Sequence, residues 1–288
     1  MKILGTGLTG LVGSRIVELL SDKNEFENLS RSSGVDITDK NQVLERIKNS
    51  DAQVVLHLAA KADVDGCEGD KSLGREGEAW KINVEGTRNV ADACLQTNKK
   101  LIYISTDFVF DGKKEVYQED DIPSPINWYA QTKYEGEKTV QELKTSWIIA
   151  RIAYPYRVNF VKPDFFRAIF NRLKNGEPVA AVTDHIFTPT YIDDIAFALD
   201  ALLIGNYNGI FHVVGSQSLT PFDAANLIAD KFELDKSKIS KTTRSEFFNN
   251  RASRPFQLAL KNDKITKLGI EMRTFEQGLI EVKSQINL

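Results

Sequence analysis

The sequence predicts an α/β protein built on a doubly wound parallel sheet, with a smaller, interleaved α+β lobe. Apolar runs typical of strands alternate with amphipathic helical runs through about residue 150 of the 288-residue chain. This alternation is typical of a parallel sheet with helices on both faces. The first strand also begins almost at residue 1 and leads straight into a glycine-rich turn and a helix.

The first strand, Lys2–Thr6, is followed by Gly7-Leu-Thr-Gly10-Leu-Val-Gly13 and by apolar residues at helical spacing up to Leu20. Strand, glycine turn and helix in this order are the context of a dinucleotide-binding fingerprint. Gly7 permits the tight turn, Gly10 lets the backbone approach a pyrophosphate, and Gly13 lets helix and strand pack closely. The expected cofactor-binding residues here are Gly7, Leu8, Thr9, Gly10, Leu11, Val12 and Gly13.

The second strand, near 25–30, runs into Ser30-Arg31-Ser32-Ser33 and lacks the acidic residue that would hold the adenosine ribose. An arginine with flanking serines suits a 2′-phosphate, so NADP(H) is favoured, with NAD(H) as the alternative. The competing interpretation is that Arg31 is a simple loop cation. Asp36 could receive the adenine amino group, and Thr38 or Asp39 can cap the next helix.

The next strands place small and polar residues at their ends. The strand 53–58 ends at Leu58-Ala59-Ala60, beneath which a cofactor can lie, and a helical stretch over 76–97 contains Asn83. The strand 101–104 leads into Ser105 and Thr106, and 147–150 is a further strand. Ligands of open parallel sheets bind beyond this carboxyl edge.

Tyr129 and Lys133 lie four residues apart and therefore share one face of a helix. The ammonium can stabilise the phenolate, and the hydroxyl of Thr106 can bind the same substrate oxygen. These groups can move a proton on or off a sugar or ketone oxygen while a cofactor moves the hydride. The pair Tyr134 and Lys138 has the same spacing but lies about 140° further round the helix. The first pair is preferred because Ser105-Thr106-Asp107 precedes it and 123–127 leads into its helix.

After Tyr156 the alternation loosens. Helices are expected at 165–173, 192–203 and from Thr220, with a strand at 209–214. We therefore expect a dinucleotide-binding domain of the Rossmann type over 1–155, to which 188–204 returns. The remainder of 156–288 is expected to form the smaller, substrate-binding lobe.

Composition argues against several classes of function. A net charge of −3 gives no support for nucleic-acid or membrane-surface binding, and no apolar run approaches 18 residues. With no charged and apolar leader before Met1, a cytoplasmic enzyme is expected. Cys67 and Cys94 lack partners at metal or disulfide spacing, so no metal is expected. His57 and His212 are interpreted as structural, and His185 as a candidate for substrate contact.

Nine groups of motifs spread over nearly the whole chain carry a family resemblance. They are Gly7-x-x-Gly10-x-x-Gly13, His57-Leu-Ala-Ala60, Val64-Asp65, Ile82-Asn-Val-Glu-Gly-Thr-Arg-Asn89, Ser105-Thr-Asp-Phe-Val-Phe-Asp-Gly112, Tyr117-x-Glu-Asp120, Tyr129-x-x-x-Lys133 with Gly136-Glu137, Thr188-Pro-Thr-Tyr191, and Arg254-Pro255 before Lys267-Leu-Gly269. The chain resembles an extended short-chain dehydrogenase/reductase, and within that group the dTDP-4-dehydrorhamnose reductases. The motifs are highly specific for the superfamily and less so for the substrate.

The resemblance implies NAD(P)H-dependent reduction of a 4-keto nucleotide sugar. It makes Tyr129 the proton donor to the C4 oxygen, Lys133 the group that lowers its pKa and holds the nicotinamide ribose, and Thr106 a partner of the same oxygen. The cofactor-lining positions that it adds to the glycine turn and Arg31 are Asp36, Ile37, Leu58, Ala59, Ala60, Asn83 and Ser105. The expected substrate residues are Thr106, Asp107, Phe108, Tyr154, Thr188 and Arg254, the last pairing with the diphosphate.

Three departures affect the expected substrate. The family pattern Arg-Thr-Ser-Trp-x-Tyr-Gly is Arg151-Ile-Ala-Tyr-Pro-Tyr-Arg157 here, so Tyr154 replaces a tryptophan and Arg157 a glycine. Ala130 replaces the glycine that usually follows the tyrosine of the helix. The identity of the 4-keto sugar therefore stays open, as does a homodimer.

Rival functions share some of these residues. A 4,6-dehydratase is disfavoured because Phe108 stands where its glutamate would be. A 4-epimerase keeps the same triad, although Arg31 disfavours its tightly held NAD. A non-catalytic NADP-binding regulatory subunit is a further alternative, since relatives of these reductases are partners of methionine adenosyltransferase. The intact Thr106, Tyr129 and Lys133 argue against it.

Overall fold

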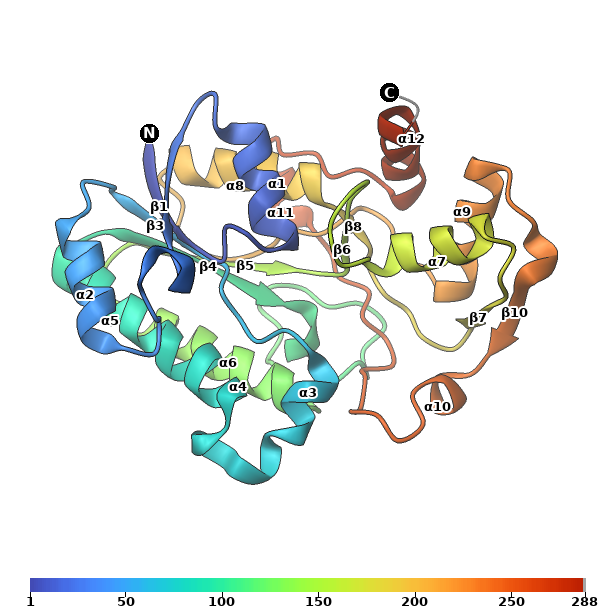
Figure 1. Ribbon diagram of the computed structural model, residues 1–288, viewed down its shortest axis with the longest axis horizontal. Coiled ribbons are helices and arrows are strands. Elements are labelled where there is room, and N and C mark those ends of the chain that lie inside the picture. Colours follow the sequence, from blue (N-terminus) through green and yellow to red (C-terminus); the bar gives the residue numbers. More distant parts are fainter. Residues whose placement is uncertain (287–288) are drawn as a thin grey trace.

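The central feature of the computed structural model, which describes residues 1–286, is a parallel sheet of six strands (Figure 1). The strand order is β2-β1-β3-β4-β5-β9. The strands are β1 (Lys2–Thr6), β2 (Glu25–Leu29), β3 (Val54–His57), β4 (Lys100–Thr106), β5 (Trp147–Ile152) and β9 (Gly209–His212). This arrangement confirms the predicted doubly wound parallel sheet.

Helices cover both faces of the sheet because successive side chains of each buried strand point to opposite faces. Ile3 packs with Ile16 of one helix layer, whereas its neighbour Leu4 packs with Val43 of the other. One layer holds α1 (Leu11–Leu20), α8 (Ile192–Ile204) and α11 (Asp263–Thr266). The opposite layer holds α2 (Lys40–Asn49), α5 (Thr87–Thr97) and α6 (Trp128–Gln141) (Figure 1).

The smaller lobe lies beyond the carboxyl ends of the strands (Figure 1). Its core is aromatic, with Tyr156, Phe166, Phe187 and Phe275 buried together. Its elements are α7 (Phe165–Lys174), β7 (Val179–Val182), α9 (Pro221–Phe232), β10 (Ile239–Thr242), α10 (Arg244–Phe247) and α12 (Phe275–Ile286). Two short strands, β6 (Pro155–Tyr156) and β8 (Thr190–Tyr191), pair where the chain passes between sheet and lobe.

One segment expected in the lobe belongs to the sheet instead. The strand predicted at 209–214 is β9, which pairs in parallel with β5. The reason is that α8 returns to pack on α1 and forms a helical crossover to the next parallel strand. The lobe is therefore built from two segments of the chain, one before α8 and one after β9.

The helix expected over 76–97 is a composite. It contains α4 (Glu78–Trp80), a π-helical turn η3 (Lys81–Gly86) and α5, after a short helix α3 (Val64–Gly69) and a 3₁₀ segment over Lys71–Glu76. A π-helical turn inside a helix often marks a functional region. Here the turn contains Asn83 and lies beside α6.

Candidate active site

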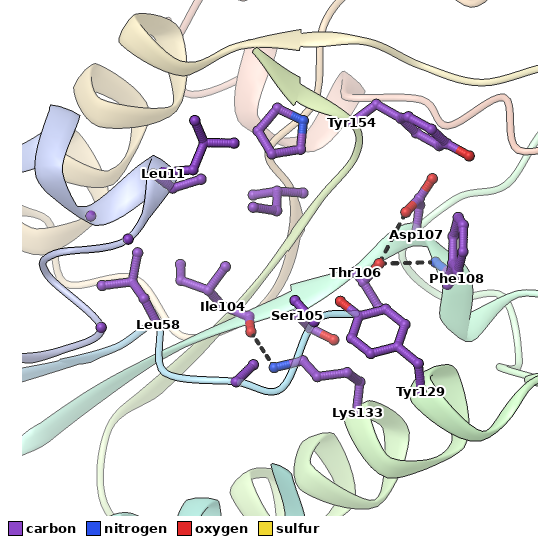
Figure 2. A pocket seen from close by; sticks show the side chains of 18 of the residues that line it. Leu11, Leu58, Ile104, Ser105, Thr106, Asp107, Phe108, Tyr129, Lys133 and Tyr154 are labelled. Atoms are coloured by element: carbon purple, nitrogen blue, oxygen red, sulfur yellow. Dashed lines mark hydrogen bonds between the residues drawn. The ribbon is translucent and has the colours of Figure 1, made fainter. Parts of the chain in front are cut away.

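A cavity of about 440 Å³ opens at the carboxyl edge of the sheet, between the glycine turn and α6. Figure 2 shows side chains from the ends of β3, β4 and β5, from α1 and from α6 facing this space. Its lining brings together most of the residues expected to act on cofactor and substrate. They are Gly7, Gly10, Leu11, Val12, Gly13, Leu58, Ala60, Ser105, Thr106, Asp107, Phe108, Tyr129, Lys133 and Tyr154.

Thr106, Tyr129 and Lys133 converge in this cavity as predicted from their order in the sequence. Thr106 ends β4, and Tyr129 lies in the first turn of α6. The Lys133 ammonium donates to the Ile104 carbonyl at 2.8 Å and lies 4.1 Å from the centre of the Tyr103 ring. Tyr134, the alternative tyrosine, does not line the cavity and lies beneath the Lys138 ammonium instead.

Burial has the largest effect on the pKa values of Tyr129 and Lys133. It raises the pKa of the Tyr129 phenol above its ordinary value, and the nearby Thr106 hydroxyl acts in the opposite direction. Burial lowers the pKa of Lys133 to about 7, although Glu137 acts to raise it. The phenol is therefore held in its protonated form, which is the form that a proton donor requires.

The position of α6 is fixed by contacts at both ends. The Asn127 side chain accepts from the Ala130 N–H at 2.8 Å and so caps the helix immediately before Tyr129. Further along, Glu137 and Arg151 form a fully buried two-point ion pair, with nitrogen–oxygen distances of 2.9 and 2.7 Å, between α6 and β5. Tyr129 and Lys133 lie between these anchors, so their positions relative to the end of β4 are well defined.

The glycine turn fits a dinucleotide pyrophosphate. Gly7 has a φ of +68°, and a Cβ there would lie 2.7 Å from the Ala59 nitrogen. A Cβ at Gly13 would come within 2.7 Å of the Leu8 Cα, so both positions require glycine. Helix α1 begins at Leu11 without a side-chain cap or an acidic residue in its first turn. Its free N–H groups can therefore receive an anionic phosphate.

The second strand leads to the predicted ribose side of the cofactor site. Because β2 pairs with β1 in parallel, Leu29 lies beside Thr6, the residue before the glycine turn. Arg31 is exposed in a 3₁₀ turn and donates to Asp36 at 3.0 Å. Asp36 also accepts from the Thr38 N–H and hydroxyl. The residue expected at the 2′-phosphate is thus bonded to the residue expected at the adenine amino group.

Asn83 supports the site from behind. It is fully buried, exchanges two hydrogen bonds with the Lys61 backbone at 2.8 and 3.1 Å, and donates to Thr132 of α6 at 2.9 Å. It does not line the cavity. Its observed contacts hold the loop after β3 against the helix that carries Tyr129. Leu8, Thr9, Ile37 and Ala59 likewise lie outside the cavity lining.

Two of the expected substrate residues, Thr188 and Arg254, are set back from the cavity. The Thr188 hydroxyl is buried and bonds the Leu258 carbonyl, the Leu260 N–H and the Ser218 hydroxyl. The Arg254 Nη1 donates to Asp65 at 2.5 Å and to the Ala252 carbonyl at 2.6 Å. Within residues 1–286 its Nε and Nη2 donate to no other residue, so one edge of the guanidinium can receive an anion.

The other two candidate cations for the diphosphate, Arg157 and Arg167, also bond to groups of the protein. Arg157 donates to Ser14 at 3.0 Å and to Glu18 at 2.6 Å, and Arg167 donates to the Phe160 carbonyl at 2.7 Å. Within residues 1–286 the Arg167 Nε and Nη2, like those of Arg254, donate to no other residue, whereas Arg157 donates through both of its terminal nitrogens.

A second cavity of about 540 Å³ lies in the smaller lobe. Its walls are largely apolar and aromatic, and Tyr154 lines both cavities. The φ of Tyr154 is +39°, a strained conformation for a residue with a side chain, and such strain concentrates at functional sites. The second cavity is lined by Tyr154, Phe165, Ala168, Ile169, Arg172, Pro178, Val179, Ala180, Ala181, Val182, His185, Phe187, Pro221, Phe247 and Phe248.

The three histidines differ in their surroundings. His57 is buried between the Thr6 and Thr87 hydroxyls, and His212 bonds the Lys261 carbonyl. His185 bonds the Pro255 carbonyl through Nδ1, which must therefore carry the proton. Its Nε2 therefore accepts a hydrogen bond from the Tyr154 hydroxyl at 3.2 Å, which orients the tyrosine.

Sequence reasoning missed five residues of the first cavity, namely Ala62, Val64, Ile104, Ile152 and Pro155. Their signal was positional, since each lies at or shortly after the carboxyl end of a buried strand. Apolar residues at such positions provide the walls of the site rather than its chemistry, and no residue type marks them.

Within residues 1–286, no group of three histidine, cysteine, aspartate or glutamate side chains is placed to hold a metal ion. No helix in the same range has the length and apolar character needed to cross a membrane.

Comparisons with known proteins agree over the full length. The family model described as the RmlD substrate binding domain matches residues 1–287. The chain is 30% identical to the dTDP-4-dehydrorhamnose reductase of Aggregatibacter actinomycetemcomitans, over 98% of each protein. It is also 31% identical to methionine adenosyltransferase 2 subunit beta of Pongo abelii, over 97% of this chain and 86% of that protein. A crystal structure of dTDP-4-dehydrorhamnose reductase from Bacillus anthracis str. Ames in complex with NADP matches with a TM-score of 0.90 and 29% identity, covering 99% of both chains.

Proposed function

Because this chain belongs to the RmlD substrate binding domain family, we propose that it is an NADPH-dependent reductase of a 4-keto nucleotide sugar. The family membership confirms the resemblance to dTDP-4-dehydrorhamnose reductases seen in the motifs. The observation that carries the proposal is the convergence of Thr106, Tyr129 and Lys133 with the glycine turn in one cavity. A non-catalytic binding protein has no need of a buried proton donor at this position.

Each residue of the triad has a role that its contacts support. The Tyr129 phenol would give its proton to the C4 oxygen, and NADPH, when bound, would supply the hydride that makes the ketone an alcohol. Thr106 lies at the end of β4, where its hydroxyl can bond the same oxygen. Lys133 is held by the Ile104 carbonyl, and its ammonium offsets the negative charge left on the phenolate.

NADP(H) is the favoured cofactor. The dTDP-4-dehydrorhamnose reductase from Bacillus anthracis is in complex with NADP, and Arg31, which follows β2 beside β1, can supply the cation for a 2′-phosphate. Isothermal titration should show tighter binding of NADPH than of NADH. Arg31→Ala should remove the preference, because a charge-assisted bond to the phosphate is lost. A variant that keeps the preference would show that another residue causes it.

The nucleotide portion of the substrate is assigned to the lobe. The aromatic walls of the second cavity can stack on a base, and Tyr154 lines both this cavity and the catalytic one. The free edge of Arg254 supplies the cation that the diphosphate needs, which the glycine turn lacks. Tyr154 is smaller than the tryptophan of the family pattern, so the sugar site should accept a bulkier or differently substituted hexose than dTDP-4-dehydrorhamnose.

The test is an assay of the purified protein with NADPH and a panel of 4-keto nucleotide sugars. Stoichiometric loss of NADPH with formation of a 4-hydroxy sugar supports the reductase. An epimerised product with no net NADPH loss supports a 4-epimerase. Efficient turnover of dTDP-4-dehydrorhamnose alone would support the reductase and reject the enlarged sugar site.

A regulatory subunit is the second candidate, favoured by the 31% identity to methionine adenosyltransferase 2 subunit beta. Such a protein would bind NADP and a methionine adenosyltransferase but reduce no sugar. Size-exclusion chromatography with a purified methionine adenosyltransferase, in the presence of NADP, tests this directly. Complex formation combined with no turnover of any sugar would replace the reductase assignment.

A further inference from the structure

Among the described residues, Asp107 is the one acidic side chain in the lining of the catalytic cavity, and it lies next to Thr106. Its Oδ1 accepts a hydrogen bond from the Thr106 hydroxyl at 3.0 Å. Its Oδ2 is buried and has no hydrogen-bond partner within residues 1–286. A buried carboxylate oxygen without a partner is costly, so this group needs either a ligand or a proton.

The Thr106 hydroxyl has only one proton to give. It accepts from the Phe108 N–H at 3.3 Å and donates to Asp107, the two hydrogen bonds that the dashed lines of Figure 2 mark. A hydroxyl that donates to a carboxylate cannot at the same time donate to the C4 oxygen of a sugar. Whether Thr106 can donate to the C4 oxygen therefore depends on whether Asp107 accepts the Thr106 proton.

Resting on the proposed function, we infer that Asp107 is a positioning residue whose protonation state sets the direction of the Thr106 hydrogen bond. As a carboxylic acid, Asp107 donates to the Thr106 oxygen and leaves the Thr106 proton for the substrate. As a carboxylate, it captures that proton and turns a lone pair of Thr106 towards the substrate oxygen. The reduction then proceeds with protonated Asp107.

The surroundings of Asp107 favour the acid form. Burial raises its pKa to about 7, although hydrogen bonds from Thr106 and from the backbone act the other way. The titratable groups that face it are Tyr129 and Lys133 from α6 and Tyr154 from the turn after β5. Of these, Lys133 also titrates near neutrality and is bonded to the Ile104 carbonyl.

The sign of the pH dependence follows from these states. Below pH 7 Asp107 is neutral and Thr106 donates to the substrate, whereas above pH 7 the carboxylate withdraws that donor. The kcat/KM of the wild-type protein should therefore fall on the alkaline side, towards a lower plateau. Loss of the Lys133 charge would also lower kcat/KM in this pH range. The wild-type pH profile alone therefore does not show which residue causes the fall.

Asp107→Asn separates the two causes, because its amide donates to Thr106 as the acid does but does not titrate. The variant should lose the limb near pH 7 and exceed wild-type kcat/KM several-fold at pH 8.5. Asp107→Ala, which removes the acceptor, should also lose the limb. Asp120→Asn, which changes an exposed acid in the loop between β4 and α6, should keep the wild-type profile. A limb that persists in Asp107→Asn would overturn the inference while leaving the reductase activity established.

A measurement without substrate keeps the inference testable if no sugar is reduced. Infrared difference spectra of the NADP-bound protein, with Asp107→Asn as the reference, should show a carboxylic acid band at pH 6 that disappears by pH 8.5. Absence of that band at pH 6 would show that Asp107 is ionised and would overturn the inference. Its presence together with no sugar turnover would reject the proposed function alone.

Discussion

Tyr129 and Tyr134 lie five residues apart on α6, but only Tyr129 faces the catalytic cavity. Tyr129→Phe should therefore lose on the order of 10²–10⁴ in turnover, the range expected for a missing general acid. The fold and cofactor affinity should be unchanged, because the ring is retained.

Tyr134→Phe is the matched control, and its turnover should stay close to that of the wild type. Single-turnover measurements of NADPH oxidation compare the two. The reverse order of effects would mean that the other face of α6 carries the chemistry.

Arg254 and Arg251 both form ion pairs with the Asp65 carboxylate, but the two arginine side chains differ in exposure. The Arg254 side chain is 7% exposed and that of Arg251 is 44% exposed. If the free edge of Arg254 binds the diphosphate, Arg254→Ala should raise the KM for the nucleotide sugar about tenfold or more. The dissociation constant of NADPH should stay the same.

Arg251→Ala also removes one partner of Asp65, but from the surface. Its KM should match that of the wild type. An equal rise of KM in both variants would point to the integrity of the Asp65 loop rather than to a contact with the diphosphate.

At the scale of the elements, the junction of β1 and α1 allows almost no added volume. Gly13→Ala places a Cβ against the Gly7 carbonyl and the Leu8 Cα. We expect a loss of about 1–3 kcal/mol in the free energy of unfolding, as for overpacking, together with weaker NADPH binding. Thermal unfolding with and without NADPH measures both effects.

Gly69→Ala in α3 is the control, because a Cβ there meets nothing within 4 Å. This variant should keep both the melting temperature of the wild type and its rise with NADPH. Wild-type behaviour of Gly13→Ala would mean that the turn can shift without losing its function.

The elements that sequence predicted best are those with a local signal. The strand–turn–helix over residues 2–20 has its apolar period and its glycines in one short stretch. The strand β9 also has a clear local pattern, but its membership of the sheet depends on how α8 packs, which is a distant contact. The π-helical turn at 81–86 was missed because an extra residue in a helix leaves no mark in composition.

Within the site, too, sequence predicted the local features but not the contacts between residues far apart in the chain. Thr106, Tyr129 and Lys133 could be placed from sequence because strand ends and helix faces are local properties. The pairing of Arg254 with Asp65, and of His185 with Tyr154, joins residues far apart in the chain. The full bonding of Thr188 within the protein has the same origin. A family motif identifies such residues but does not show what they are bonded to.

At the scale of the whole molecule, buried histidines link stability to pH. Burial lowers the pKa of His212 from 6.5 to about 3, so it stays neutral in the folded protein at pH 5, whereas the unfolded chain binds a proton. This contribution to stability is present above pH 6.5 and is lost as the pH falls below that value. The expected slope is about 1.4 kcal/mol per pH unit for one proton.

His212→Asn tests this effect, because an amide can still donate to the Lys261 carbonyl that His212 now bonds. In urea unfolding between pH 7 and 4, the wild-type curve should fall more steeply than that of the variant by about this slope. Taking the difference cancels the titration of every other group. Parallel curves would show that His212 is protonated in the folded protein.

The π-helical turn at Lys81–Gly86 makes the architecture of the site sensitive to chain length. Removal of one residue there would restore a regular α-helix and turn everything before it by about 100° relative to α5. The packing of α5 on the sheet would survive, but the stacking of Trp80 on Trp128 would be lost. The Asn83 bridge between the Lys61 backbone and Thr132 would be lost with it. Deletion of a single codon could therefore separate the loop after β3 from the catalytic helix while the fold is preserved. This turn is thus a point where relatives could diverge by insertion or deletion.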